Sequence, residues 1–202
     1  MIPLSAKSVK QSLKDYYYRK AKQENWAARS VFKLQEIDEK YSLFHTNSTV
    51  LDLGCHPGSW LQYITKKSSK GKVIGLDRFS TKPPAENATC LLIDVFDFDP
   101  VSFGLKPLSI DVLVSDMAPD TTGIRTTDAA RSLALCERAL NLALQLLKIG
   151  GHFLVKTLQS PDTNDFAAQV RKNFSRVELV RPKATRSASR EIYIVGLDRR
   201  RN

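Results

Sequence analysis

The amino-acid sequence predicts a single α/β domain built on a doubly wound, mainly parallel sheet. Short β-rich segments alternate with amphipathic helical segments along most of the chain, which is the order that produces parallel strands joined by helices. The length of 202 residues is usual for one domain. Polar residues recur where the predicted strands end, as expected if one edge of the sheet holds a ligand.

Two helical segments precede the first predicted strand. Residues 8–22 are polar and basic, and residues 27–41 place Val31, Leu34 and Ile37 at helical spacing. The strands predicted next are residues 49–53, 72–77, 89–94, 110–116 and 152–156. The helices predicted between and after them are residues 59–67, 128–148 and 165–174.

The C-terminal part of the chain completes the predicted secondary structure. Gly150 and Gly151 are predicted to end the helix over 128–148. Residues 177–180 and 192–197 are predicted to form a final strand pair. We divide the chain into a basic helical extension, residues 1–25, and a main domain, residues 26–202.

The ends of the predicted strands carry the candidate site. Gly54, Asp77, Asp94 and Asp116 stand at the ends of the first four strands, and Lys156 ends the fifth. Parallel strands bring their carboxyl ends to one edge of the sheet. We therefore expect these five residues to lie close together.

The positive charge of the chain gathers at its two ends. The formal net charge is +10, with +6 in residues 1–33, +7 in residues 171–202 and −3 between them. Such clustering favours a polyanion, with RNA ahead of a membrane surface, although a solvated surface with a frayed basic tail gives the same charge. If RNA binds, we expect one basic face formed by Lys7, Lys10, Lys14, Arg19, Lys20, Lys22, Arg181, Lys183, Arg186 and Arg190.

Several classes of protein are disfavoured by the composition. No apolar run is long enough to span a membrane, and the N-terminus lacks the apolar region of a signal peptide. Acidic residues in the first stretch disfavour a mitochondrial presequence. Cys55, Cys90 and Cys136 are too widely spaced for a disulfide framework or a zinc site. These features predict a cytoplasmic protein without a bound metal.

The loop after the first strand predicts a nucleoside ligand without phosphates. It contains Gly54 and Gly58, but His56 occupies the second glycine position of the dinucleotide fingerprint. Asp77 lies where a carboxylate can bind two ribose hydroxyls, and Asp94 could meet the adenine edge. Together they favour S-adenosylmethionine over an ordinary strand-to-helix turn, and they oppose a dinucleotide oxidoreductase.

At this point the sequence resembles the FtsJ-type RNA 2′-O-ribose methyltransferases from about Tyr17 to Leu197. The matching motifs are Arg29-Ser-Val-Phe-Lys33-Leu, Leu51-Asp-Leu-Gly-Cys-His-Pro-Gly-Ser-Trp60, Ser115-Asp116-Met-Ala-Pro119, Phe153-Leu-Val-Lys156 and Ser189-Arg-Glu191-Ile-Tyr-Ile-Val195. The resemblance implies a Rossmann-like class I methyltransferase fold, a seven-stranded sheet with an antiparallel last strand. Ser59 replaces a glycine of the family loop, and Cys55 and His56 replace small or apolar residues, so these differences bear on cofactor affinity more than on activity.

The family's site residues carry over within these motifs. The resemblance implies the catalytic set Lys33, Asp116, Lys156 and Glu191. It implies cofactor contacts at Gly58, Trp60, Asp77, Asp94 and Asp116, to which the loop pattern adds Gly54. A ribose hydroxyl needs a base before it can attack a methyl group. We expect Lys156 to be that base. Lys33 would be the nearby second cation, which favours the neutral form of the Lys156 amine that can accept a proton.

The resemblance also implies a substrate. The compact bacterial members suggest a uridine in large-subunit ribosomal RNA, within the ribosomal subunit, modified by a monomer. Transfer RNA anticodon loops and messenger RNA caps are the alternative substrates. A non-catalytic RNA-binding assembly factor is disfavoured because all four catalytic positions are filled, and a small-molecule methyltransferase because the ends are so basic.

Overall fold

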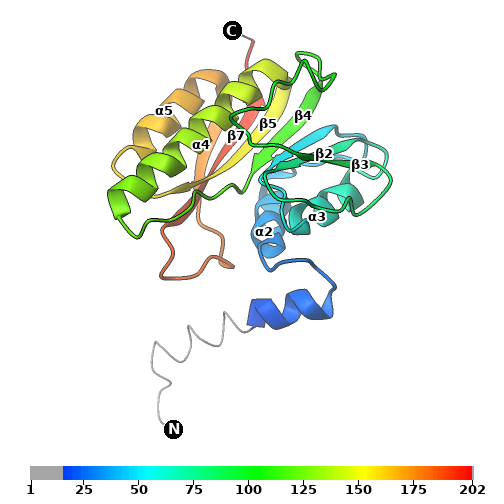
Figure 1. The fold of residues 1–202 in the computed structure, drawn as a ribbon. Coiled ribbons are helices and arrows are strands. Elements are labelled where there is room, and N and C mark those ends of the chain that lie inside the picture. Colours follow the sequence, from blue (N-terminus) through cyan, green and yellow to red (C-terminus); the bar gives the residue numbers. More distant parts are fainter. Residues whose placement is uncertain (1–15, 202) are drawn as a thin grey trace.

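The computed structural model describes residues 16–201, which form one seven-stranded sheet with helices on both faces (Figure 1). The strand order is β3-β2-β1-β4-β5-β7-β6. The strands are β1 (Val50–Leu53), β2 (Val73–Asp77), β3 (Ala88–Leu92), β4 (Ile110–Ser115), β5 (Leu147–Leu158), β6 (Phe174–Val180) and β7 (Glu191–Arg199). The helices are α2 (Val31–Tyr41), α3 (Ser59–Lys67), α4 (Arg125–Leu146) and α5 (Thr163–Asn173), and residues 16–23 are also helical.

The sheet confirms the predicted fold class. The pairs β1–β2, β1–β4, β2–β3 and β4–β5 are parallel. The last strand, β7, enters between β5 and β6 and runs antiparallel to both. The strand order reverses at β1 and β4, and in such sheets this reversal opens a crevice at the carboxyl ends.

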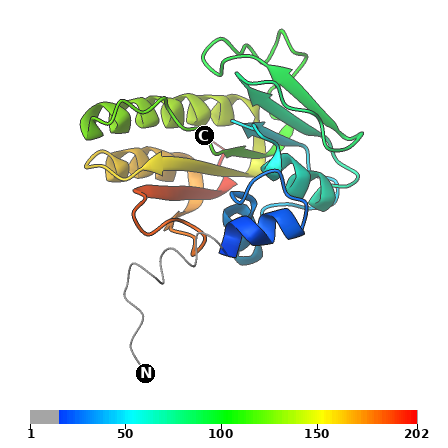
Figure 2. The same ribbon diagram turned by 60° about the horizontal axis from the view of Figure 1, so that its bottom comes forward.

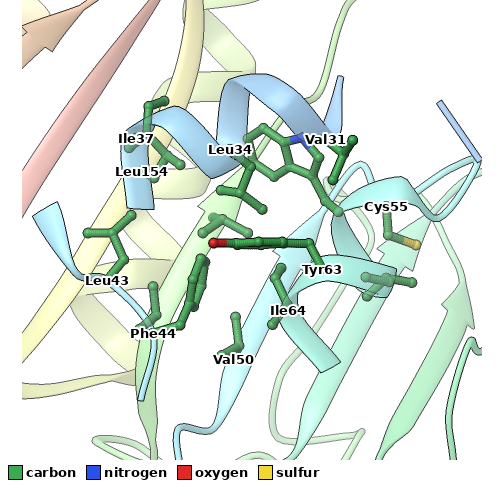
Figure 3. Packing of buried hydrophobic residues seen from close by; sticks show 14 of the residues in the cluster. Val31, Leu34, Ile37, Leu43, Phe44, Val50, Cys55, Tyr63, Ile64 and Leu154 are labelled. Carbon is green, nitrogen blue, oxygen red and sulfur yellow. The ribbon is translucent and has the colours of Figure 1, made fainter. Parts of the chain in front are cut away.

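Alternation along the strands sorts the side chains into two cores. Leu51 and Leu53 of β1 join the cluster under α4 and α5, whereas Val50 joins the cluster under α2 and α3. Figure 3 shows the second cluster, in which the Tyr63 ring of α3 lies near Phe44 and Leu43. The Tyr63 hydroxyl donates to buried Asp38 of α2 at 2.7 Å, and this bond fixes the two helices to each other.

The start of α2 differs from the prediction. The helix begins at Val31 rather than at residue 27, because the preceding segment is tied to α3 instead. The Ala27 amide donates to the Gln62 side chain at 2.8 Å, and the Gln62 amide donates back to the Asn25 carbonyl at 3.2 Å. Asn25 also has a φ of +58°, which interrupts a helix. Of the other predicted helix, residues 8–15 lie outside the described part of the chain.

Three further boundaries differ near the site. Strand β5 continues to Leu158 because Thr157 and Leu158 pair with β7, so Lys156 lies within the strand and not at its end as predicted. Helix α4 ends at Leu146 because Leu147 already pairs with Ile110 in the sheet, so Gly150 and Gly151 lie within β5 instead of ending the helix. The register shift in this pair accommodates Gly150, whose φ is +80°. Strand β3 ends at Leu92, so Asp94 stands in the following loop and not at the end of the strand as predicted.

A single methyl group added to β7 is expected to destabilise the fold. A Cβ at Gly196 would lie 2.8 Å from Cγ of the buried Phe174 ring. Overpacking of this kind typically costs about 1–3 kcal/mol, so Gly196→Ala should lower the free energy of unfolding by that amount in urea titrations.

The matched control is Gly196→Ala combined with Phe174→Leu. Since the Phe174 ring is then absent, Gly196→Ala should lower the free energy of unfolding by less than it does in the parent chain. Equal costs in both backgrounds would mean that Phe174 is not the source of the strain.

Candidate active site

A cavity of about 700 Å³ opens at the carboxyl ends of the parallel strands. Four of the six residues proposed for the cofactor line it, namely Gly54, Asp77, Asp94 and Asp116. Phe79, Phe96 and Met117 contribute apolar wall. The cavity therefore combines apolar surface with several carboxyl groups, among them Asp77, Asp94 and Asp116, which is the usual composition of a site for a small organic ligand.

Gly54 is required at the inner end of this cavity. Its φ is +81°, and a Cβ there would lie 2.7 Å from Met117 Cγ. The Gly54 amide donates to the Leu76 carbonyl at 2.8 Å, so the loop continues the pairing of β1 with β2. A side chain at this position would displace the loop and fill the cavity.

Backbone amides orient the two carboxylates predicted to bind the nucleoside. Asp77 accepts from the amides of Phe79 and His56, one on each oxygen, both at 2.9 Å. Asp94 accepts from the Phe96 amide at 2.9 Å. Each carboxylate keeps acceptor capacity, because an ionised carboxylate offers about four lone-pair sites. The turn formed by Asp94 and the Phe96 amide also brings Asp94 to the cavity, although β3 ends at Leu92.

Gly58 and Trp60 are absent from the cavity wall. The Trp60 side chain is 3% exposed in the core, and its indole N–H donates to the Ser30 carbonyl at 3.1 Å. Gly58, with a φ of +106°, precedes the first residue of α3. Both residues shape the loop around the cavity, and their contact with a cofactor stays a prediction.

The mouth of the cavity carries an ion pair that the sequence did not indicate. Arg78, directly after β2, donates from Nη1 to Asp120 Oδ2 at 2.8 Å and from Nη2 to Asp120 Oδ1. Arg131 of α4 donates to the Asp120 carbonyl at 3.1 Å. These contacts join the loops after β2 and β4, and residues so far apart in sequence leave no local pattern.

The four residues proposed as catalytic form two ion pairs. Lys33 Nζ lies 2.7 Å from Glu191 Oε2, and Lys156 Nζ lies 3.1 Å from Asp116 Oδ1. Lys156 also donates to the Asp116 carbonyl at 2.5 Å. The two lysine side chains are only 7% exposed, so each amine depends on its carboxylate for compensation of charge.

The register of β5 against β7 brings these pairs together. Lys156 lies opposite Tyr193, and Leu158 lies opposite Glu191. Directly opposed residues of an antiparallel pair share a face, as do residues two apart on one strand. Lys156, Tyr193 and Glu191 therefore point to one face, and Lys33 meets them from α2.

Tyr193 connects the two ion pairs. Its hydroxyl donates to Asp116 Oδ1 at 2.8 Å, and Lys33 Nζ lies 5.8 Å from its ring centroid. Burial, aided by the Asp116 and Glu191 carboxylates, raises the pKa of Tyr193 well above its ordinary value. Tyr193 therefore stays a neutral donor. Sequence reasoning assigned it no role, because an aromatic residue in an apolar strand is typical of a core.

Glu191 remains ionised in this cluster. Burial raises the pKa of its carboxyl group, but the Lys33 charge and hydrogen bond, with further help from Lys156, outweigh burial and lower the pKa overall. The Ser189 hydroxyl accepts from the Glu191 amide at 3.2 Å and fixes the start of β7.

Asp52 is a carboxyl group buried in the core. It is fully buried in β1, and neither carboxyl oxygen has a hydrogen-bond partner among residues 16–201. Burial, followed by the Asp116 and Asp77 charges, raises its pKa well above the ordinary value. The protonated form is therefore favoured, and no residue pattern had singled it out.

The predicted basic face is described only in part. Lys7, Lys10 and Lys14 lie outside the described residues. The helix at 16–23 packs on α2 through Tyr17, whose ring centroid lies 5.4 Å from that of Phe32. The loop between β6 and β7 meets α2 as well, since the Lys183 amide donates to Glu36 Oε2 at 2.7 Å. Figure 2 shows the helix and this loop on the same side of the sheet.

Within residues 16–201, no helix combines the length and the apolar character needed to cross a bilayer. Cys55, Cys90 and Cys136 are free thiols.

Comparison with known proteins identifies similar chains. The model of the FtsJ-like methyltransferase family matches residues 26–199. A Bdellovibrio bacteriovorus protein named ribosomal RNA large subunit methyltransferase E is 46% identical over 93% of this chain and 97% of its own. A Myxococcus xanthus protein of the same name is 42% identical over 93% of this chain and 90% of its own.

A solved structure shares the fold. It is a Plasmodium falciparum protein provisionally described as a ribosomal RNA methyltransferase. The TM-score is 0.76 with 28% sequence identity, covering 86% of this chain and 98% of the other.

The ionisation of Asp52 should appear in the pH dependence of stability. Because its pKa is raised on folding, it contributes stability below its ordinary pKa of about 4, and that contribution is lost as pH rises through the folded-state pKa. Asp52→Asn cannot ionise. Its free energy of unfolding minus that of the parent should therefore rise from pH 4.5 to 7.5, by at most about 1.4 kcal/mol per pH unit.

Urea titrations of both proteins at several pH values measure this difference. A difference that stays flat over the range would show that Asp52 ionises in the folded protein as it does in the unfolded chain.

Proposed function

We propose, from the premise that this chain belongs to the FtsJ-like methyltransferase family, that it transfers a methyl group from S-adenosylmethionine to the 2′-hydroxyl of a uridine in large-subunit ribosomal RNA. The single observation that carries the proposal is the pair of buried lysine–carboxylate bridges, joined by Tyr193, beside the cavity. The names of the bacterial relatives support the choice of RNA.

The cavity suits the proposed methyl donor. Asp77 and Asp94 hold oriented carboxylates for hydroxyls and an adenine edge, and neighbouring carboxyl groups favour a positively charged sulfonium. When bound, S-adenosylmethionine supplies a methyl group on that sulfonium. Asp116 lines the same cavity and contacts Lys156, so it would connect the donor site to the catalytic amine.

Lys156 is proposed as the base for the ribose hydroxyl. In its neutral form Lys156 Nζ would take the hydroxyl proton, while Asp116, which lines the cavity and accepts from the Tyr193 hydroxyl, orients the amine. Lys33 and Glu191, on the other side of Tyr193, would position the ribose and its phosphate. A general base of this kind typically contributes about 10² to 10⁴ in rate.

We also propose that the chain acts as a cytoplasmic monomer on the large subunit. All four charged residues come from one chain, so the site needs no second copy. The test incubates the protein and methyl-labelled S-adenosylmethionine with large subunits, small subunits, naked ribosomal RNA and transfer RNA, followed by nucleoside analysis.

The expected product is 2′-O-methyluridine from large-subunit RNA. Label on a base would contradict the proposed reaction. Label in transfer RNA alone would mean that transfer RNA, and not large-subunit RNA, is the substrate. RNA binding without any transfer would favour an assembly factor.

Loss of the Asp77 carboxylate is expected to weaken binding of S-adenosylmethionine. A lost hydrogen bond to a charged group costs on the order of 1.5–3 kcal/mol, which isothermal calorimetry on Asp77→Ala would detect. Asp77→Asn is the control, because its amide oxygen can still accept from one of the two backbone amides that orient the carboxylate. Unchanged affinity for S-adenosylmethionine in both variants would mean that its ribose binds elsewhere.

Replacement of Lys156 by arginine should abolish chemistry and spare binding. Arginine keeps the positive charge but does not lose its proton in proteins, so Lys156→Arg should be nearly as slow as Lys156→Ala, about 10² to 10⁴ below the parent. Single-turnover transfer with saturating RNA and cofactor measures the rate, and affinities are measured on the same preparations. A near-normal rate for Lys156→Arg would reject Lys156 as the base.

A further inference from the structure

The loop between β6 and β7, residues 181–190, is held from two sides. At one end Arg181 Nη2 donates to three carbonyls of the loop, those of Arg186 at 3.4 Å, Ser187 at 3.2 Å and Ser189 at 2.5 Å. On the other side the Lys183 amide donates to Glu36 of α2. The sequence grouped Arg181 with the RNA contacts, but in the structure its guanidinium shapes the loop.

This loop brings Arg186 near the start of α2. The Ser189 amide donates to the Arg186 carbonyl at 2.9 Å, and Glu191 follows two residues later. Glu191 pairs with Lys33, and Arg29 stands four residues before Lys33, directly ahead of α2. The Lys33–Glu191 pair therefore fastens together the two segments that carry Arg29 and Arg186.

The Lys33–Glu191 contact at 2.7 Å brings the segments that carry Arg29 and Arg186 close enough for their charges to act on each other. Burial lowers the pKa of the Arg29 guanidinium, the nearby Arg186 lowers it further, and Glu191 acts in the opposite direction. Glu191 is already paired with Lys33. Among residues 16–201, neither Arg29 nor Arg186 has a carboxylate within ion-pair distance. Two neighbouring guanidinium groups without an anion make a suitable site for a phosphate, which guanidinium binds through paired hydrogen bonds.

We propose that Arg29 and Arg186 clamp one backbone phosphate of the RNA beside the target ribose, and that Arg181 is the positioning residue that holds the clamp. This inference rests on the proposed function. It adds a single-phosphate contact, adjacent to Lys33 and Glu191, to the general attraction of the basic ends for RNA.

The test uses a short RNA hairpin with the nucleotide found by nucleoside analysis, and its neutral methylphosphonate analogues substituted one phosphate at a time. For the parent protein, one substitution next to the target should weaken binding about tenfold or more. The variants Arg29→Gln and Arg186→Gln, alone or together, should bind the unmodified hairpin with that same loss and should not respond to the substitution. The magnitude of their log–log salt slope should fall by roughly 0.7–0.9, the value for one phosphate contact.

Arg171→Gln is the matched control. Arg171 is exposed in the last turn of α5, which leads back to the amino ends of the strands, and its loss removes the same charge. It should leave the methylphosphonate response unchanged. Arg181→Lys keeps the charge but cannot reproduce the contacts to three carbonyls, so it should lose the response as Arg186→Gln does, with affinity for S-adenosylmethionine intact.

The outcomes separate the clamp from the proposed function. If the parent methylates RNA but Arg29→Gln and Arg186→Gln behave like Arg171→Gln, the clamp is wrong and the function stands. A double variant that still responds to the methylphosphonate also overturns the clamp. If the parent neither binds nor methylates any RNA, both proposals fail.

Discussion

The antiparallel pairing of β7 with β5 is the constraint on which the site depends. Its register sets Lys156 opposite Tyr193 and places Glu191 two residues further along the same face. A slip of one residue would turn Tyr193 and Glu191 to the opposite face, under α4 and α5. Asp116 joins them from the position directly after β4, at the same edge, and α2 supplies Lys33. One strand inserted against the direction of its neighbours thus assembles residues from four distant segments.

The buried charges at this edge are balanced locally. Each lysine has its own carboxylate, and Tyr193 donates to one pair while its ring faces the other. Breaking such a buried pair is strongly destabilising because it leaves an uncompensated charge. Asp52 of β1 is also buried, has no hydrogen-bond partner in the described part of the chain, and is favoured in the neutral form. The site therefore holds two ion pairs without net excess charge, next to a cavity whose carboxylates face an incoming cation.

Local sequence patterns predicted the helices, the strands and many site residues. They did not predict the contacts between segments that lie far apart in the sequence. Strand alternation predicted the sheet, and strand ends predicted Gly54, Asp77 and Asp116 at the cavity. The ends of α4 and β3 were misplaced because pairing of Leu147 in the sheet and a turn at Asp94 override local preference. The roles of Tyr193, Arg181 and the Arg78–Asp120 pair depend on tertiary contacts alone, so no spacing in the sequence indicates them.

We propose that the two ion pairs act as one catalytic unit across Tyr193. The most direct measurement is the single-turnover methyl-transfer rate of Lys33→Met, Asp116→Asn and the double variant, at saturating RNA and cofactor. Residues that act as a unit show grossly non-additive losses. The double variant should therefore be about as slow as the slower single variant. If the losses in activation free energy simply add, Lys33 and Asp116 act independently and the claim of one unit is wrong.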